Sequence, residues 1–374
     1  MKILFATNHF WHYTGSELNL IGMARAMAER GHEVACVAQV VSPLMRSGLQ
    51  SIGLRLLEAQ GEAVAKFAPD VAFCQHHSSA ALVRSRLPAV PMVLAHLGVE
   101  PELEQAPLLD CGVGLHLAIS EEVRGQLLSQ GIPDGSIRIF RNAIDTSLLQ
   151  GGSDAAGRQD VLLFSYKLRP EGTSLLASVV QEFGMNLDAA ALTTHGVALP
   201  ADIAARLGRA RLVFASGRSA LEAAMSGAAV IILGPKGLDG PLTAHTWRDL
   251  ALCNFSGRRH GHALAAEPLR KAVAEALQSD VAATRDELQA AFGLRQRAED
   301  LERFLTQVPA AAMDEEALAR IRRLSLLLYE QRLLAMQQKD AERDFERQQL
   351  REQEAAKPLW RRLIRRLLGR YPPG

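Results

Sequence analysis

The chain has 374 residues, of which 48% are hydrophobic and 22% charged, and its formal net charge is +1. This length is too great for one ordinary core, and so small a net charge gives no reason to expect a nucleic-acid partner. The cysteines form no CxxC pair, which predicts buried thiols rather than disulfides or zinc ligands. The N-terminus lacks the apolar core of a signal peptide, and no apolar run is long enough to span a membrane, so we expect a cytoplasmic protein.

The first part of the chain alternates short apolar runs with helical spacing. A strand at 2–6, a helix from about 17 to 30 and a strand at 33–41 predict a β-α-β unit, and hence a parallel sheet with a right-handed crossover. Further strands are expected at 70–75, 91–98, 115–120 and 136–142. Because these runs are apolar throughout, both faces of the sheet should be covered. We therefore expect a doubly wound α/β domain over residues 1–150.

A polar, glycine-rich stretch at 151–159 predicts a linker to a second α/β domain over residues 160–308. Its clear strands are expected at 161–168, 211–216 and 228–234, with one or two further βα units between 175 and 205. The remaining segment, 313–374, predicts a helical extension. Its first part, 313–356, has irregular heptads, so it either packs across the two domains or pairs with a second copy of the chain.

The extension ends in a segment with one apolar stripe and one basic face. The apolar residues stand at i, i+3, i+4, i+7 and i+8: Trp360, Leu363, Ile364, Leu367 and Leu368. Arginines occupy the other face: Arg361, Arg362, Arg365, Arg366 and Arg370. This pattern predicts that residues 358–370 contact an anionic membrane surface. The alternative is that the apolar stripe packs against the protein itself or a partner.

A glutamate, Glu222, follows the turn Ser216-Gly217-Arg218-Ser219 at the predicted carboxyl end of the strand 211–216. Ligands of parallel sheets collect at this edge, where helix N-termini present free N–H groups. Gly217 allows close backbone approach and Arg218 supplies positive charge, whereas Glu222 could accept two sugar hydroxyls. The sequence thus fits a nucleotide site, with phosphate at the helix start and ribose on the glutamate. The alternative is that Ser219 and Glu222 form a capping box.

Other strand-end loops carry candidate polar residues. Thr14-Gly15-Ser16-Glu17 is a second possible capping box, and Asn8 and His12 lie in the same predicted loop. His96 ends the strand 91–98, and His76-His77 follow the strand 70–75. Lone histidines are often structural, so their function stays open. Lys236 lies in a Gly-Pro-rich turn at 234–240, which either contacts a ligand or is a simple surface turn.

Three stretches resemble one enzyme family. They are YTGSELNLIGMARAMAERGHEV, the run LAISEEVRGQLLSQGIPDGSIRIFRNAIDTSLL, and LEAAMSGAAVII. They are similar to motifs of glycosyltransferases with two Rossmann-like domains facing across a cleft, the GT-B architecture, and most similar to the GT4-type group. The resemblance implies that Glu222 holds the nucleotide ribose, and that the Gly15-Ser16-Glu17 loop approaches donor phosphate or acceptor.

The resemblance also implies roles for three further side chains. Lys167 and Arg169 stand near the Arg-Lys pair that neutralises the leaving diphosphate in that group, and His96 stands near its acceptor-side histidine. The family's sugar-contacting glutamate before Gly-Phe-Gly has no match, since Ser216-Gly217-Arg218-Ser219 occupies its place. That loop is closer to the Ser-Gly turn of the peptidoglycan N-acetylglucosaminyltransferase type. The donor sugar and the stereochemical outcome are therefore open.

The resemblance implies transfer of a sugar from a nucleotide-sugar donor to a hydroxyl of a sugar or lipid-linked acceptor, without a metal cofactor. The amphipathic tail suggests synthesis of an envelope polysaccharide, lipopolysaccharide or glycolipid on the inner face of the membrane. Two alternatives remain. One is a sugar-nucleotide epimerase of similar architecture, and the other is a non-catalytic scaffold that binds sugar nucleotide.

Overall fold

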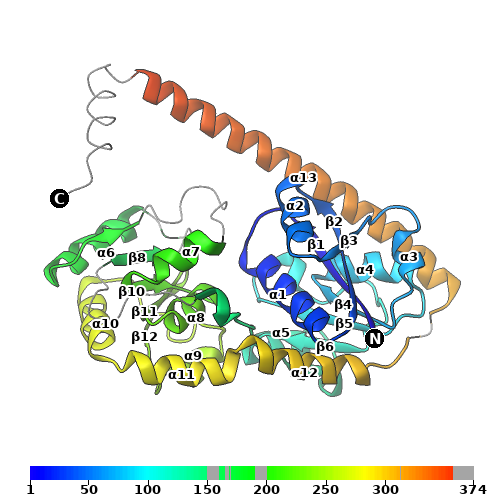
Figure 1. Cartoon of the computed structure of the whole chain (residues 1–374), viewed down its shortest axis with the longest axis horizontal. Helices are drawn as coiled ribbons and strands as arrows, with labels where there is room; N and C mark the ends of the chain where they lie inside the picture. The colour runs from blue at the N-terminus through cyan, green and yellow to red at the C-terminus, as the bar shows by residue number, and fades with distance from the viewer. Residues whose placement is uncertain (150–159, 165–167, 169, 190–199, 312, 357–374) are drawn as a thin grey trace. The chain divides into compact units, whose positions relative to one another are not determined.

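The structure is a computed structural model that describes residues 1–149, 160–164, 168, 170–189, 200–311 and 313–356. The chain divides into two compact units, Met1–Ser325 and Leu326–Gly374. The first unit contains two α/β lobes, each built around its own sheet (Figure 1). Within its described residues, the second unit continues one long helix that begins in the first.

The first lobe contains a seven-stranded sheet in the order β3-β2-β1-β4-β5-β6-β7, and each neighbouring pair is parallel. Its strands are β1 (Lys2–Phe10), β2 (Glu33–Val41), β3 (Arg55–Leu57), β4 (Val71–Gln75), β5 (Met92–His96), β6 (Leu115–Ala118) and β7 (Ile137–Ile139). Its helices are α1 (Gly15–Glu29), α2 (Pro43–Ser51), α3 (Ala63–Phe67), α4 (His77–Arg86) and α5 (Glu121–Ser129). Short 3-10 turns are Glu102–Glu104, Asp134–Ser136 and Thr146–Leu149. The predicted doubly wound domain is confirmed, and its strand order reverses between β1 and β4.

Two features of this lobe differ from the sequence prediction. β1 continues beyond residue 6, because Phe10 is fully buried and pairs with Val41 of β2. Helix α4 was not predicted, because its buried face includes small polar side chains such as Ser78 and Ser79. Both differences move polar residues of the predicted loops onto regular elements at the carboxyl edge of the sheet.

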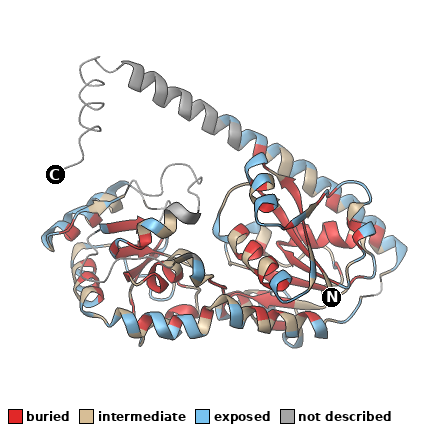
Figure 2. Cartoon of the chain, in the orientation of Figure 1, coloured by how far each residue is buried: buried red, intermediate tan, exposed pale blue. Residues whose placement is uncertain are grey.

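The second lobe contains a five-stranded sheet in the order β12-β11-β10-β8-β9. Its strands are β8 (Asp160–Phe164), β9 (Leu187–Asp188), β10 (Ala210–Ala215), β11 (Ala229–Gly234) and β12 (Gly237–Leu242). Its helices are α6 (Pro170–Glu182), α7 (Pro200–Leu207), α8 (Arg218–Met225), α9 (Trp247–Ala251), α10 (Ala266–Gln278) and α11 (Val281–Phe292). Alternate residues of its strands belong to two separate apolar clusters. The strands of both lobes consist largely of buried residues (Figure 2).

The segment 234–240, expected as a ligand-contacting turn, is largely a strand. β12 pairs antiparallel with β11, and the connecting turn is Pro235-Lys236. Gly234 is required here, because a Cβ on it would lie 1.9 Å from the backbone oxygen of Ser256. The close approach packs the loop before Gly257 against the carboxyl end of β11.

The chain passes between the lobes at two paired segments. Ile144 and Gly293 form a parallel bridge, in which the Ile144 amide donates to the Phe292 carbonyl and the Leu294 amide donates to the Ile144 carbonyl, both at 2.9 Å. The helix that follows, α12 (Leu294–Gln307), packs on the first lobe and adds Ala298, Leu301 and Leu305 to its core. The second lobe thus ends near Gly293, earlier than the expected 308, because α12 buries its apolar face against the other lobe.

The predicted helical extension is confirmed over its described residues, where it forms one helix, α13 (Glu315–Ala356). The expected basic helix at 358–370 lies outside the described residues. None of the described helices is both long and apolar enough to cross a membrane. Within the same part of the chain, no three His, Cys, Asp or Glu side chains are placed to hold a metal ion.

Candidate functional site

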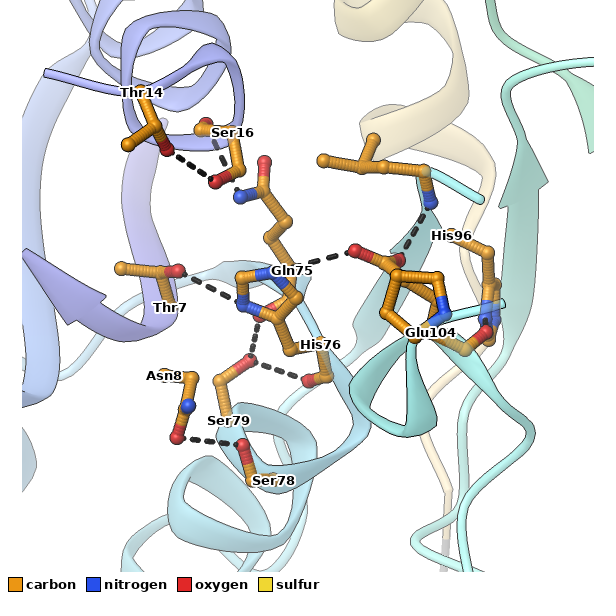
Figure 3. Close-up of polar contacts among 12 residues, drawn as sticks. Thr7, Asn8, Thr14, Ser16, Gln75, His76, Ser78, Ser79, His96 and Glu104 are labelled. Atoms are coloured by element: carbon orange, nitrogen blue, oxygen red, sulfur yellow. Dashed lines mark hydrogen bonds and ion pairs between the residues drawn. The ribbon is translucent and has the colours of Figure 1, made fainter. Parts of the chain in front are cut away.

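The carboxyl ends of β1 and β4 meet where the first sheet reverses its strand order, and this is where open α/β sheets bind ligands. The side chains of Thr7, Asn8, Gln75 and His76 gather at this edge, near the start of α1 (Figure 3). Gln75 is fully buried, and its amide donates to the Ser16 carbonyl at 3.1 Å. Its side-chain oxygen has no hydrogen-bond partner, so it is an available acceptor at the switch point.

A chain of polar contacts runs from α4 through β1 to α1. Ser78 Oγ donates to Asn8 Oδ1 at 3.0 Å, which turns the Asn8 amide towards His9 Nδ1, 3.4 Å away. His9 Nε2 lies 3.3 Å from Glu17 Oε1, within ion-pair distance, but this buried carboxylate oxygen accepts no hydrogen bond. Glu17 is almost fully buried, and its Oε2 accepts from Ser16 Oγ at 2.8 Å and from Thr14 Oγ1. The carboxylate is thus held by two hydroxyls and lies beside the His9 ring.

The Thr14-Glu17 pair is not the expected capping box. Thr14 stands at the N-cap position of α1, but its side chain bonds to the Glu17 carboxylate and not to a backbone amide. Glu17 is held instead by side chains and by His9. Gly15 and Ser16 occupy the first two positions of α1, so the helix begins two residues earlier than expected.

A second imidazole–carboxylate pair lies beside the first. His76 Nε2 is 3.3 Å from Glu104 Oε1, and His76 Nδ1 is 3.2 Å from Thr7 Oγ1. Glu104 Oε2 accepts from the Leu97 amide at 2.6 Å. His76 stacks on His9, with ring centroids 5.9 Å apart, and has a φ of 74°, in the left-handed region that non-glycine residues rarely adopt. Such strain is common at functional sites.

His96, the predicted acceptor-side histidine, lies deeper. Its Nδ1 is 2.9 Å from the Glu104 carbonyl oxygen, and its Nε2 is 3.0 Å from His116 Nδ1, so both ring nitrogens already have partners. Burial lowers the pKa of His96, and burial together with His96 lowers the pKa of His116 to about 3. Both rings are therefore neutral at pH 7, and His96 supports the segment that carries Glu104 (Figure 3).

In the second lobe, α8 begins at Arg218 directly after the carboxyl end of β10. The N-cap is Gly217, with φ 59°, and Ser216 precedes it. The alternative, a capping box between Ser219 and Glu222, is not formed, because the N-cap is Gly217 and Glu222 is the fifth residue of α8. Glu222 Oε1 accepts instead from Arg218 Nε at 2.7 Å.

Arg218 joins this helix to the first lobe. Its Nη1 donates to the Ala143 carbonyl at 2.8 Å, and a Cβ placed on Gly15 would lie 3.7 Å from Arg218 Cδ. The N-terminal ends of α1 and α8 therefore meet at Arg218. The side chains of Arg218 and Glu222 remain 13% and 14% exposed, so ligand atoms can reach them. Helix N-termini and an arginine bind anions, and a carboxylate binds paired hydroxyls.

Further contacts between the lobes involve residues that the sequence did not single out as partners. Arg258 donates two hydrogen bonds to the Glu122 carboxylate, at 2.8 and 2.7 Å. These hydrogen bonds raise the pKa of Arg258. Asn142 donates to Asn254 Oδ1 at 2.9 Å. Lys236, expected at the ligand, is 3.3 Å from Glu100 Oε1 of the first lobe.

Two predicted site residues, Lys167 and Arg169, lie outside the described residues. The sequence predicts Gly15, Ser16, Glu17, Arg218 and Glu222 as site residues, and the structure brings this set to one place. The sequence does not indicate His9, Glu104 or His116, which the structure adds to this region. Only His9 had a usable signal, since it follows an apolar run at its carboxyl end.

Two α/β sheets of seven and five strands, parallel except for the edge strand β12, and the helix α12 that returns to the first lobe match the GT-B architecture. No family model and no curated protein matches the sequence. Among solved structures, HepE from Anabaena in complex with UDP and glucose is similar, with a TM-score of 0.56 and 14% identity over 82% of this chain and 100% of HepE. A glycosyltransferase from Rickettsia africae has a TM-score of 0.59 and 12% identity over 82% of this chain and 98% of its own. A putative UDP-N-acetylglucosamine 2-epimerase from Listeria monocytogenes has a TM-score of 0.54 and 14% identity over 84% and 99%.

Proposed function

We propose that the protein is a glycosyltransferase that moves a sugar from a nucleotide-sugar donor to a hydroxyl acceptor. The observation that carries this proposal is the meeting of two helix N-termini at Arg218, with the Glu222 carboxylate one helical turn away. A diphosphate bound at Arg218 would place its nucleoside ribose within reach of Glu222. HepE, which has the same architecture, was solved with UDP and glucose.

The donor end of this site needs positive charge, because departure of a nucleoside diphosphate leaves negative charge on the phosphate oxygens. Arg218 and the first amides of α1, at Gly15 and Ser16, supply it in the described residues. We propose that Lys167 and Arg169, which follow β8 in the sequence, add to it. Ser216, Gly217 and Ser219 would contact the same phosphates from the start of α8.

The Glu222 carboxylate can hold a ribose without losing its present partner. Oε1 accepts from Arg218 Nε, and this bond fixes the rotamer of the carboxylate. The Glu222 side chain is 14% exposed, so we propose that Oε2 is the oxygen that meets the ribose. A 2′- or 3′-hydroxyl can donate to Oε2 while Arg218 stays in place. The (i, i+4) pair therefore orients the carboxylate for a ligand.

The acceptor would enter from the first lobe, where buried imidazole and carboxylate groups gather at the switch point. We propose that His96 acts there indirectly, by holding the Glu104 segment. Lys236 would act through its pair with Glu100, which links the turn after β11 to the first lobe. No metal ion is invoked, because cationic side chains and helix N-termini occupy the place where the diphosphate would bind.

The location of the reaction is a further part of the proposal. The pattern at 358–370 favours contact with an anionic membrane surface, so the acceptor would be an envelope polysaccharide, lipopolysaccharide or glycolipid precursor. The protein would then work in the cytoplasm, peripheral to the membrane. Helix α13 carries exposed Leu326, Leu327 and Leu334, which favour self-association through 313–356.

Epimerisation is a second candidate, because solved epimerases from Listeria monocytogenes and Methanocaldococcus jannaschii share the fold with TM-scores of 0.54 and 0.53. Purified full-length protein is incubated with a panel of nucleotide sugars, with and without crude lipid extract. Release of nucleoside diphosphate that increases with lipid, together with a glycosylated lipid, supports transfer. Conversion of the sugar nucleotide to an isomer without an acceptor supports epimerisation. Donor binding without any turnover would contradict both and support a scaffold.

A further inference from the structure

Hydrogen bonds between three pairs of neighbouring residues form a closed ring around the start of α8. The pairs, which we call the Arg218 ring, are Asn142-Ala143, Gly217-Arg218 and Asn254-Phe255. The Gly217 amide donates to the Phe255 carbonyl at 2.7 Å. Asn142 Nδ2 donates to Asn254 Oδ1 at 2.9 Å. Arg218 Nη1 donates to the Ala143 carbonyl at 2.8 Å, so each pair is bonded to the other two.

The Arg218 ring joins the two lobes. Ala143 is buried in the apolar core of the first lobe, and Phe255 is buried in that of the second. The Ala143 amide also donates to Asn19 Oδ1 of α1, at 3.3 Å. Asn142 and Phe255 are 5% and 0% exposed, so water competes little for the bonds of the ring. The ring therefore fixes Arg218 relative to both lobes.

The segment that carries Asn254 and Phe255 has an unusual backbone. Their φ values are 50° and 53°, in the left-handed region. Asparagine tolerates this region, but a bulky residue such as phenylalanine is strained there. The Phe255 ring packs against Phe292, with centroids 5.6 Å apart, next to the backbone bridge at Gly293. Such strain persists only where surrounding contacts hold it, and it is concentrated at functional sites, so this segment does more than connect α9 to α10.

The ring leaves part of the Arg218 guanidinium for a ligand. A guanidinium has five N–H groups in one plane. Nε donates to Glu222 and Nη1 donates to the Ala143 carbonyl, and these two bonds fix the orientation of that plane. The other N–H groups can then donate to phosphate oxygens. Recognition of phosphate by arginine depends on the orientation of the plane, so the contacts that hold Arg218 also determine how well it binds.

We propose that Asn142 and Asn254 are positioning residues of the donor site, which hold Arg218 against the diphosphate of the nucleotide sugar. This inference rests on the proposed function. Neither asparagine touches the ligand; Asn142 acts through Ala143, and Asn254 acts through Phe255. Loss of the bond between the asparagines opens the ring, and the guanidinium then loses orientation before the ligand binds. Diphosphate affinity falls, because the ligand must order a side chain that the parent protein holds in place.

The test measures diphosphate binding to the full-length protein by isothermal titration calorimetry. The parent is titrated with UDP, GDP, ADP, CDP and dTDP, and the one that binds most tightly is used for the variants. Asn254→Gly removes the side-chain amide and keeps a residue that adopts a positive φ freely. Asn142→Ala breaks the same bond from the other side. Each should raise the dissociation constant about five- to tenfold, and the double variant should raise it no further, because one bond is lost in all three.

Arg218→Ala distinguishes positioning from a general effect on the fold. It should raise the dissociation constant by about thirtyfold, because it removes a charged donor to the phosphates. Adding Asn254→Gly to Arg218→Ala should then change the constant by less than about twofold, because no guanidinium remains to be positioned. A purely structural asparagine would have the same effect with and without the arginine. Additive effects of Arg218→Ala and Asn254→Gly would therefore overturn the inference.

Ala68 supplies the control for the glycine substitution. It has φ 48° and is exposed at the C-cap of α3. Ala68→Gly should keep the dissociation constant within about twofold of the parent. An unchanged constant in Asn142→Ala and Asn254→Gly, or an effect in only one of them, overturns the inference and leaves the transferase proposal intact. If the parent binds none of the five diphosphates, the proposed function is overturned and the inference with it.

Discussion

Replacing Glu222 with alanine separates ligand binding from fold stability. In the proposed complex the carboxylate accepts bonds from two ribose hydroxyls, and hydrogen bonds to charged groups contribute about 1.5–3 kcal/mol each. Loss of both is therefore expected to cost about 3–6 kcal/mol of binding free energy, which raises the dissociation constant by at least about a hundredfold. Glu222→Gln, which keeps one carbonyl oxygen but no charge, should lie between the parent and Glu222→Ala.

The effect on folding should be much smaller. Glu222 accepts from Arg218 in an (i, i+4) pair that is mostly but not fully buried. Such a pair contributes about 0.5–1 kcal/mol, and alanine restores part of it through its higher helix propensity. For a chain of this size that corresponds to a melting-temperature change of about 2 °C. The binding effect should thus exceed the folding effect severalfold.

Isothermal titration calorimetry measures the binding effect, with the nucleoside diphosphate that the parent protein binds. Differential scanning calorimetry measures the change in melting temperature. Glu182→Ala is the control, because Glu182 also pairs with an arginine, Arg270, but does so at an exposed site at the last residue of α6, on the opposite edge of the sheet. It should change neither the dissociation constant nor kcat. A fall of many degrees in Glu222→Ala with an unchanged dissociation constant would refute the ribose role and make Glu222 a structural residue.

Three further outcomes are expected. Gly234→Ala should destabilise the second lobe by about 1–3 kcal/mol in urea unfolding, because its Cβ would meet the Ser256 backbone, whereas Gly125→Ala, with open space around it, should not. The free energy of unfolding should fall as the pH drops below 6.5, by up to about 1.4 kcal/mol per pH unit from His116 alone. The unfolded chain binds a proton at this histidine, whereas the buried ring of the folded protein stays neutral until about pH 3. Urea unfolding of His116→Asn should show a shallower pH dependence. Deletion of residues 358–374 should abolish sedimentation with anionic liposomes, and undiminished binding would reject the membrane role.

The sequence predicts the two sheets well, because apolar runs of parallel strands are buried on both faces. The run 33–41 matches β2 residue for residue, and the runs at 70–75 and 228–234 match β4 and β11 within one residue. It predicts the short elements poorly. β9 has two residues and β3 has three, so neither gives a periodic signal. β12 was missed because GLDGPL has the glycine and proline of a turn, and only its antiparallel pairing with β11 makes it a strand.

The site was predicted from local motifs, and its errors come from long-range contacts. The serine–acid spacing at Ser219 and Glu222 fits a capping box, but the residues at the N-terminus of α8 form other hydrogen bonds. The Gly217 amide donates to the Phe255 carbonyl at 2.7 Å, from a segment 38 residues further along the chain, and Arg218 binds the carboxylate. Similarly, the pairing of His76 with Glu104 depends on how the loop after β5 folds, and the spacing of residues in the sequence cannot predict that fold.

Arg218 is the clearest case in which tertiary structure changes the meaning of a residue. In the sequence it is a cation near a helix start, and exposed cations are the default for surface turns. In the structure its Nη1 bonds to the carbonyl of Ala143, and the next residue, Ile144, forms the backbone bridge to Gly293 where the chain passes between the lobes. The guanidinium is thus fixed to the paired backbone of the junction, and not to an exposed ion pair such as Lys236–Glu100. A cation held this way keeps its position relative to both helix N-termini, which is the requirement for stabilising charge that develops on a leaving phosphate.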